Sequence, residues 1–334
     1  MNLFIDTNVL LSFYHLTGDD LEELKKLTVL LEQKKLRLYL PSQVVAEFRR
    51  NREAKIADAL NKLKEQRLNL QFPQICKDYP EYASLRTLQK QYETQHAALL
   101  NKLSEDVEQR NLKADVITTQ LFKLAARIEC DDAVLKSARD RVDLGNPPGK
   151  NGSLGDAANW EALLAGAADK SDLYFVSGDK DYRSALDDES FSGFLADEWE
   201  QKKKSDIVFY QRISAFFKEK FPHIKLAMEL EKDLLVEGLV NSRSFARTHE
   251  VVSKLSKYSE FSADEFNRIV VAATNNSQVS SIIDDADIHK FLAKVTQTYQ
   301  QHIDGQNFLD FARLMFRLGT PLQVDGKELV FEAT

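Results

Sequence analysis

Five acidic residues stand where predicted strands end or predicted helices begin. Asp6 ends the run FID, Glu47 lies in VVAEF, Asp156 opens a helical pattern, and Asp179 and Asp181 follow YFVS. The carboxyl ends of parallel strands meet at one edge of a sheet, so these side chains can lie together. Clustered carboxylates repel one another and need a cation, and hard oxygen ligands select Mg²⁺ or Mn²⁺ rather than zinc. We therefore expect a site for one or two of these ions.

Each of these acids also has an ordinary structural explanation. Asp6 and Asp156 suit helix N-caps, Glu47 suits an exposed helix face, and Asp179 and Asp181 suit a turn. For any single residue that explanation is the commoner one. The joint occurrence of all five in this order favours a site.

Two hydroxyl residues stand directly beside the acids. Thr7 follows Asp6, and Ser177 ends the apolar run before Asp179. A hydroxyl at either position can donate a hydrogen bond to a carboxylate or to a metal-bound water. We expect both to support the ligands rather than to react.

Candidate phosphate contacts come from local clusters of cations. The chain carries 45 Lys and Arg against 52 Asp and Glu, a net charge of −7, which repels polyanions overall but leaves room for a basic segment to bind phosphate. Arg49, Arg50 and Arg52 begin such a segment within one helical turn of Glu47, which places them near the scissile phosphate if the helix continues. Lys150, in a Gly/Pro-rich loop, is the fourth candidate, and ordinary solvated surface is the alternative for all four.

The elements that must position these residues follow from apolar patterns. NLFID, RLYLP, DLYFVS and SDIVFY are short apolar runs bounded by turn signals, which predicts four buried strands. Helical patterns separate them, starting near Leu21 and Ser42. Alternating strands and helices predict a three-layer α/β/α domain around a small parallel sheet. We expect residues 1–48 and 142–222 to build it.

A long insertion is predicted between the second and third strands. From about 50 to 142 the pattern is almost wholly helical, broken mainly between Phe72 and Pro80. The stretch GNPPGKNGSLG that follows is the richest in Gly and Pro and must be a loop.

Beyond Pro222 the strand signals disappear, and helical patterns continue to about Leu318. Ser262 and Glu265 have the spacing of a capping box. The tail has a weak hairpin signal at Asp325 and Gly326. We therefore predict two domains, residues 1–222 and 223–334, the second helical and of unknown role.

The order of the acidic motifs resembles that of the PIN-domain nucleases. FIDTNVLL, VVAEF, LGDAANWEALL and YFVSGDKDY carry the resemblance, which covers roughly residues 1–222 and includes a long helical insertion. Residue by residue, Asp6, Glu47, Asp156 and Asp179 match the family's acidic metal-binding positions, and Asp181 matches an extra acid. The resemblance implies a metal-dependent ribonuclease, although some relatives cut DNA or structured nucleic acids.

We accordingly predict an endoribonuclease in which Mg²⁺ or Mn²⁺ activates a water for in-line attack on RNA, without a side-chain nucleophile. Three alternatives stay open. The site could cut DNA or particular nucleic-acid structures, the chain could be a non-catalytic nucleic-acid-binding or protein adaptor, or it could be a toxin or defence effector. In the last case the C-terminal helices or a regulatory protein partner would hold it silent. Homo-oligomer formation also stays open.

Other classes of protein are disfavoured. No apolar run approaches the roughly 20 residues of a membrane span, and Asp6 comes too early for a signal peptide, so we expect a cytoplasmic protein without membrane contact. Cys76 and Cys130 are too few and too far apart for a disulfide framework or a zinc site. The chain lacks HxH, HExxH, GxxxxGK[ST], GxGxxG and GxSxG, which argues against histidine-led metal, nucleotide-binding and serine-hydrolase sites.

Overall fold

The computed structural model describes residues 1–15, 19–68, 70–149, 153–324 and 327–331. The chain divides into two compact units, Met1–His223 and Ile224–Thr334, here called the N-terminal and C-terminal units. Among the described residues, no helix has the length and apolarity needed to cross a membrane.

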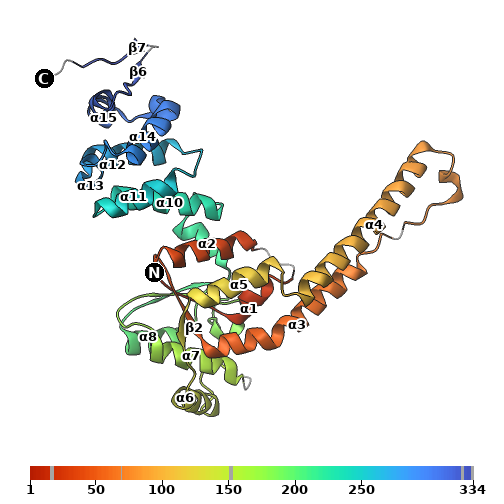
Figure 1. Ribbon diagram of the computed structural model, residues 1–334. Coiled ribbons are helices and arrows are strands. Elements are labelled where there is room, and N and C mark those ends of the chain that lie inside the picture. Colours follow the sequence, from red (N-terminus) through yellow and green to blue (C-terminus); the bar gives the residue numbers. More distant parts are fainter. Residues whose placement is uncertain (16–18, 69, 150–152, 325–326, 332–334) are drawn as a thin grey trace. The chain divides into compact units, whose positions relative to one another are not determined.

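The N-terminal unit is built on a five-stranded sheet (Figure 1). All neighbouring strands are parallel, and their order is β3-β2-β1-β4-β5. The central strands are almost entirely apolar because both faces of a parallel sheet are covered; Leu3, Phe4 and Phe175, for example, are fully buried. The predicted α/β class with a small parallel sheet is confirmed. The strands are β1 Asn2–Ile5, β2 Arg37–Pro41, β3 Ala126–Ile128, β4 Leu173–Val176 and β5 Ile207–Tyr210.

Helices cover both faces of this sheet. Figure 1 shows α2 and α5 on one side and α7 and α8 on the other. The predicted helix starts near Leu21 and Ser42 are confirmed, and Asp156 lies in the first turn of α7. The bounds are α1 Thr7–Ser12, α2 Leu21–Glu32, α3 Ser42–Glu65, α5 Lys113–Leu124, α6 Asp132–Asp143, α7 Leu154–Gly166, α8 Gly193–Lys203 and α9 Ile213–Lys220.

The stretch predicted as a helical insertion, 50–142, contains a sheet strand. β3 pairs with β2 through Tyr39–Ala126 and Pro41–Ile128, so the expectation that only residues 1–48 and 142–222 build the sheet is wrong. Three residues between two helices are too short to show the alternation by which strands are recognised.

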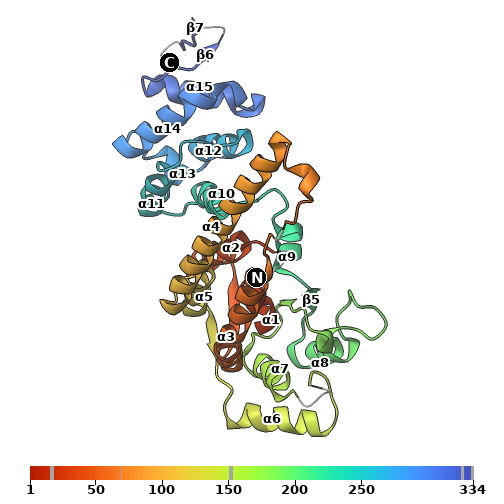
Figure 2. The ribbon, with the colours of Figure 1, turned by 90° about the vertical axis from the view of Figure 1, so that its right-hand side faces the viewer.

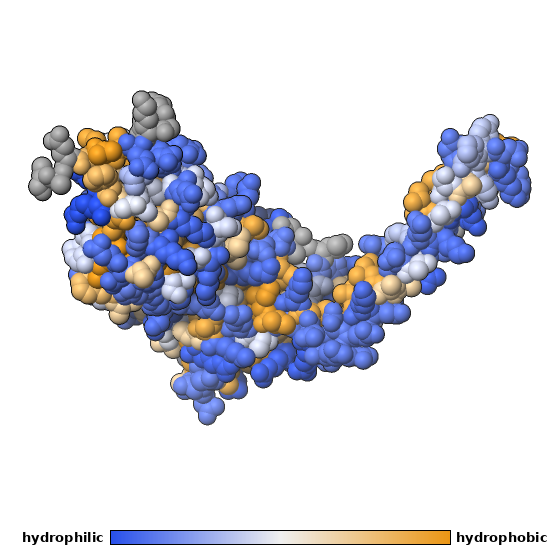
Figure 3. Space-filling view, turned by 45° about the horizontal axis from the view of Figure 1, so that its top comes forward, coloured by the Kyte–Doolittle hydropathy of each residue, from blue (hydrophilic) through white to orange (hydrophobic). Residues whose placement is uncertain are grey.

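A helical hairpin forms the first part of that stretch, before α5. The second half of α3 runs beside α4, Pro80–Glu108, and the short helix η1, Gln74–Cys76, lies in the connection (Figures 1 and 2). Tyr92 donates to the carbonyl of Gln66 at 2.7 Å, and Nε2 of His96 lies 2.8 Å from the carbonyl of Leu63. No residue of α4 is buried, and Figure 3 shows apolar patches among hydrophilic side chains along the hairpin.

The C-terminal unit is helical with its own apolar core, which includes Leu235, Val252, Phe266, Phe291 and Phe311. The elements are α10 Ala227–Val240, α11 Phe245–Leu255, α12 Ala263–Asn275, α13 Ser277–Ser280, α14 Ala286–Tyr299, η3 Gln300–His302 and α15 Gly305–Arg317, then the antiparallel pair β6 Gln323–Val324 and β7 Lys327–Glu328.

Two local predictions concern this unit. The capping box is confirmed at the start of α12, where Ser262 N donates to Glu265 Oε2 at 2.7 Å and Glu265 N donates to Ser262 Oγ at 3.2 Å. The predicted turn at Asp325 and Gly326 lies outside the described residues.

Candidate functional site

Asp6 follows β1 directly and is only 3% exposed. Its backbone N–H donates to Val176 at the end of β4, so the ends of the two central strands meet there. The carboxylate caps α1 by accepting from the backbone of Thr7 at 2.7 Å, and it also accepts from Ser177 Oγ at 2.6 Å and Asn8 Nδ2 at 2.9 Å. The Asp6 carboxylate therefore serves as the N-cap of α1 and is also the candidate metal ligand.

Glu47 is brought to Asp6 by α3, which packs against α1. The buried Thr7 hydroxyl donates to Glu47 Oε2 at 3.2 Å, so Thr7 contacts both acids. Ser177 likewise links Asp6 to a second acidic residue. Its hydroxyl donates to the Asp6 carboxylate and accepts from the backbone N–H of Asp179 at 3.0 Å.

Asp156 lies in the first turn of α7, and the N-cap residue of that helix is Ser153. The Ser153 hydroxyl donates to the Asp156 carboxylate. A Cβ placed on Gly155 would stand 2.8 Å from Gln43 Nε2 and 3.9 Å from Glu47 Oε2, so this turn packs closely on α3. That close approach carries Asp156 to Glu47.

Asp179 and Asp181 lie just after β4. Asp179 accepts from the backbone N–H of Asp181 at 2.9 Å and so caps the short helix η2, Lys180–Tyr182. Asp181 in turn accepts from the backbone N–H of Gly149 at 3.2 Å, which joins the loop before α7 to the loop after β4. We call Asp6, Glu47, Asp156, Asp179 and Asp181 the acid cluster.

The members of the acid cluster interact electrostatically. Burial, followed by repulsion from Asp156 and Glu47, raises the pKa of Asp6 to about 7, against a lowering contribution from the Ser177 hydrogen bond. Burial, with repulsion from Asp179, Glu47 and Asp181, raises the pKa of Asp156 to about 6. In the part of the chain that the structure describes, no lysine or arginine forms an ion pair with any of the five. Among the described residues, no ion pair therefore compensates their negative charge.

The chemistry of this donor set fits a hard divalent cation. Every side-chain donor is a carboxylate oxygen, and repulsion of this kind is relieved when a cation binds. The side chains are not gathered around one point: among the described residues, no group of three or more His, Cys, Asp or Glu could hold a metal ion as it stands. Asp6, Asp156 and Asp179 instead accept hydrogen bonds from neighbouring serines and backbone N–H groups.

The predicted phosphate-binding cations separate into different environments. Arg52 Nε donates to Asp115 Oδ1 at 2.6 Å, and its side chain is 12% exposed, so its guanidinium belongs to an ion pair between α3 and α5. Arg49 and Arg50 are exposed. Lys150 lies outside the described residues.

Of the three arginines, Arg50 is the one whose position on α3 faces nearly the same direction as Glu47. At about 100° per residue, Arg49 lies about 200° around α3 from Glu47, whereas Arg50 lies about 60° away. Arg49 and Arg52 line a groove together with Val45, on the side of α3 that faces α5. Arg49 is thus oriented away from Glu47 and Arg52 is paired with Asp115, so Arg50 is the one of the three that is oriented toward the acid cluster. Contact of these arginines with the scissile phosphate stays a prediction.

A cleft of about 430 Å³ beside Asp179 adds residues that the sequence analysis missed. Asn8 orients two groups there: it donates to Asp6, and its Oδ1 accepts from the backbone N–H of Gly178 at 3.3 Å. Lys180 and Arg212 supply cations. The signal for Arg212 was its position just after SDIVFY, because that strand ends at the same edge of the sheet.

A parallel sheet with five carboxylates near the carboxyl ends of its central strands defines an α/β/α domain with an acidic edge. A family model described as the PIN domain matches residues 3–182, more than half of the chain, and the chain belongs to the PIN-domain family. The match runs from β1 to η2 and includes the whole acid cluster, and PIN domains are in general nucleases. Searches of curated proteins and of solved structures returned no match.

Proposed function

We propose that this protein is a metal-dependent endoribonuclease that hydrolyses RNA phosphodiester bonds at the acid cluster. The observation that carries the proposal is that five carboxylates at one edge of the sheet lie near enough to repel one another, that burial and this repulsion raise the pKa values of two of them, and that the five have no cationic partner among the described residues. Repulsion within such a cluster lowers the stability of the fold, and carboxylates with shifted pKa values are typical of functional sites.

Asp6, Asp156 and Asp179 would hold one or two Mg²⁺ or Mn²⁺ ions, assisted by Glu47 and Asp181. Such an ion, when bound, makes water more acidic and stabilises charge on a phosphodiester. No side-chain nucleophile is required.

The other residues of the site orient the ligands and bind the substrate. Thr7 and Ser177 hold the Asp6 and Glu47 carboxylates through the hydrogen bonds described above. Lys180 and Arg212, in the cleft beside Asp179, are suited to contact the phosphates that flank the cleaved bond. Arg50 is exposed and leans toward Glu47, which makes it a third candidate for such a contact.

The test is cleavage of total RNA by the purified full chain in Mn²⁺, with and without excess EDTA, followed by sequencing of the new ends. We expect new internal ends that need the metal. Asp6→Asn should remove them, whereas Asp197→Asn, at an exposed acid of α8, should not.

A matched pair of labelled single strands, one RNA and one DNA of the same sequence, separates ribonuclease from deoxyribonuclease activity. Preferred cleavage of the DNA strand would overturn the choice of RNA. Full activity in EDTA would overturn the metal mechanism.

A further inference from the structure

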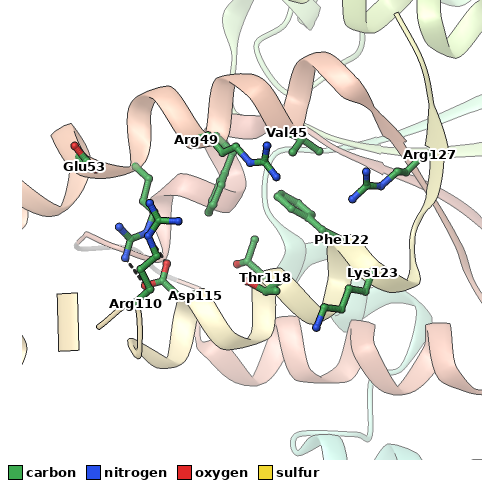
Figure 4. Close-up of a pocket in the computed structure, with 12 residues that line it drawn as sticks. Val45, Arg49, Glu53, Arg110, Asp115, Thr118, Phe122, Lys123 and Arg127 are labelled. Atoms are coloured by element: carbon green, nitrogen blue, oxygen red, sulfur yellow. Dashed lines mark hydrogen bonds and ion pairs between the residues drawn. The ribbon is translucent and has the colours of Figure 1, made fainter. Parts of the chain in front are cut away.

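A groove of about 440 Å³ lies between α3 and α5 (Figure 4). Its volume is that of an ordinary small-ligand pocket. Its floor is apolar, with Val45, Phe48 and Phe122, and its rim is largely cationic. We call it the cationic groove, and its lining residues are Val45, Phe48, Arg49, Arg52, Glu53, Arg110, Asp115, Thr118, Thr119, Phe122, Lys123 and Arg127.

The rim carries more positive charge than the described residues neutralise by ion pairing. Arg52 is paired with Asp115. The other four cations, Arg49, Arg110, Lys123 and Arg127, are exposed and form no ion pair within the described residues, and Glu53 is the only further acid of the lining. They come from four segments: α3, the turn before α5, α5 and β3. Like charges held together without a partner favour an anionic ligand.

The aromatic floor of the cationic groove indicates which class of anion fits it. Phe122 packs edge-on against Phe48 with ring centroids 5.3 Å apart, and Figure 4 shows the guanidinium groups of Arg49 and Arg127 on either side of the Phe122 ring. An aromatic ring between phosphate-binding cations is the arrangement with which proteins hold single-stranded nucleic acid, since a base stacks on the ring. The hydroxyl of Thr118, buried in the lining, has no hydrogen-bond partner among the residues that the structure describes.

The cationic groove is separate from the acid cluster. Arg49 and Glu47 lie on opposite faces of α3, about 200° apart. Glu47 contacts Thr7 of α1, whereas Arg49 lines the groove with residues of α5 and β3. A phosphate bound in the groove is therefore not the phosphate at the acid cluster.

We propose that the cationic groove binds a nucleotide of single-stranded RNA at a distance from the cleaved bond and so favours long substrates over short ones. The choice of RNA rests on the proposed function, but the groove's affinity for a single strand does not require turnover. An acidic peptide is the competing occupant, disfavoured because it would leave the aromatic ring without a stacking partner.

The test compares two double variants of the full chain. Arg49→Ala with Arg127→Ala removes the two cations beside Phe122, and Lys136→Ala with Arg139→Ala removes two exposed cations of α6 as a matched control. Binding is measured in an Asp6→Asn background by fluorescence anisotropy of a labelled single-stranded RNA of about 16 nucleotides over a range of salt. We expect the groove variant alone to bind more weakly, with a log–log salt slope reduced by about 1.4 for two lost phosphate contacts.

A cleavage assay with chains that retain the wild-type Asp6 separates the two proposals. The groove variant should retain the turnover of a dinucleotide substrate and lose efficiency on the long strand. Suppose that the chain with Asp6 cleaves no RNA, while the Arg49→Ala, Arg127→Ala variant still binds RNA more weakly than the control. The proposed function would then be wrong, and the proposed role of the groove would be supported. Equal RNA affinity and equal salt slope in the groove and control variants would refute RNA binding by the cationic groove. Stronger competition by polyglutamate than by unlabelled RNA would also refute it.

Discussion

At the scale of single residues, Asp6 shows that a helix cap and a functional carboxylate need not be alternatives. Its side chain accepts three hydrogen bonds, and those from Ser177 and Thr7 lower its pKa, yet burial and the neighbouring acids raise that pKa more. The local structure holds the carboxylate in place, while no ion pair with a described lysine or arginine compensates the charge of the acid cluster.

Removing one charge from the acid cluster should remove activity. We expect Asp6→Asn and Asp179→Asn each to lower the cleavage rate by more than about 100-fold, because charge stabilisation at the reacting phosphate is lost. Ser177→Ala, which removes only a supporting hydrogen bond to Asp6, should cost roughly 10- to 100-fold. Initial rates on labelled RNA measure both, with Asp197→Asn as control. A normal rate for either Asn variant would place the site elsewhere.

The raised pKa of Asp6 predicts an unusual dependence of stability on pH. Its pKa is about 7 in the folded chain and 3.8 as a reference, so between these values the folded state binds a proton that the unfolded state has released. The free energy of unfolding in EDTA should therefore fall as pH rises from about 4 to about 7, by on the order of 4 kcal/mol through Asp6. Asp156, with a pKa of about 6, should act in the same direction.

Denaturant unfolding across this pH range measures the effect. Asp6→Asn cannot release the proton, so its curve should be flatter and should lie above that of the wild type near pH 7.5. Added Mn²⁺ should stabilise the wild type more than the variant, because the ion binds only the folded cluster. Parallel pH curves for the two proteins would contradict the assignment.

At the scale of elements, helix α3 makes contacts through two different faces. One carries Glu47 to α1 and α7, and the other carries Arg52 to α5. Asp115 of α5 accepts from Arg52 and also from the hydroxyl of Tyr14 at 2.5 Å, so it joins three segments. This cluster of polar groups belongs to the packing of the domain.

Breaking this ion pair should destabilise the fold and leave substrate binding to other residues. We expect Asp115→Asn to lower the free energy of unfolding by about 3 kcal/mol, because it leaves the Arg52 guanidinium largely buried without its charge partner. Arg52→Leu with Asp115→Leu should recover much of that loss, as measured by urea unfolding. The double variant should cleave RNA at a normal rate. A selective loss of RNA affinity in it would return Arg52 to the substrate-binding residues.

At the scale of the whole chain, each unit has an apolar core of its own. The core of the C-terminal unit draws on residues from Leu235 to Leu322, and the five-stranded sheet and acid cluster lie within Met1–His223. We propose that the two are separate domains and that the C-terminal one controls substrate choice or binds a regulatory protein.

Truncation tests this proposal. The fragment 1–223 should be soluble, should unfold cooperatively and should cleave generic RNA within a few-fold of the full-chain rate, because it retains the entire acid cluster. Its selectivity among cellular RNAs should differ, as read by sequencing of cleavage ends. An aggregated fragment would show that the two units share a core, and unchanged selectivity would remove the role proposed for the C-terminal unit.

The sequence by itself determined the features that local signals encode. The four longer strands, the helix starts at Leu21 and Ser42, and the capping box at Ser262 follow from apolar periodicity and cap chemistry within a few residues. The acids were predicted to converge because strand ends share one edge of a sheet, a rule that needs only the positions of the strands.

Only the tertiary structure decided which distant groups meet. β3 is recognisable as a strand because β2 pairs with it, and Arg52 is committed to Asp115, which lies 63 positions further along the chain. The cationic groove likewise depends on the packing of α5 against α3 and on the pairing of β3 with β2, which together place Arg127 and Arg49 in one lining. Contacts of this kind are set by sheet order and helix packing, to which no short window of sequence is sensitive.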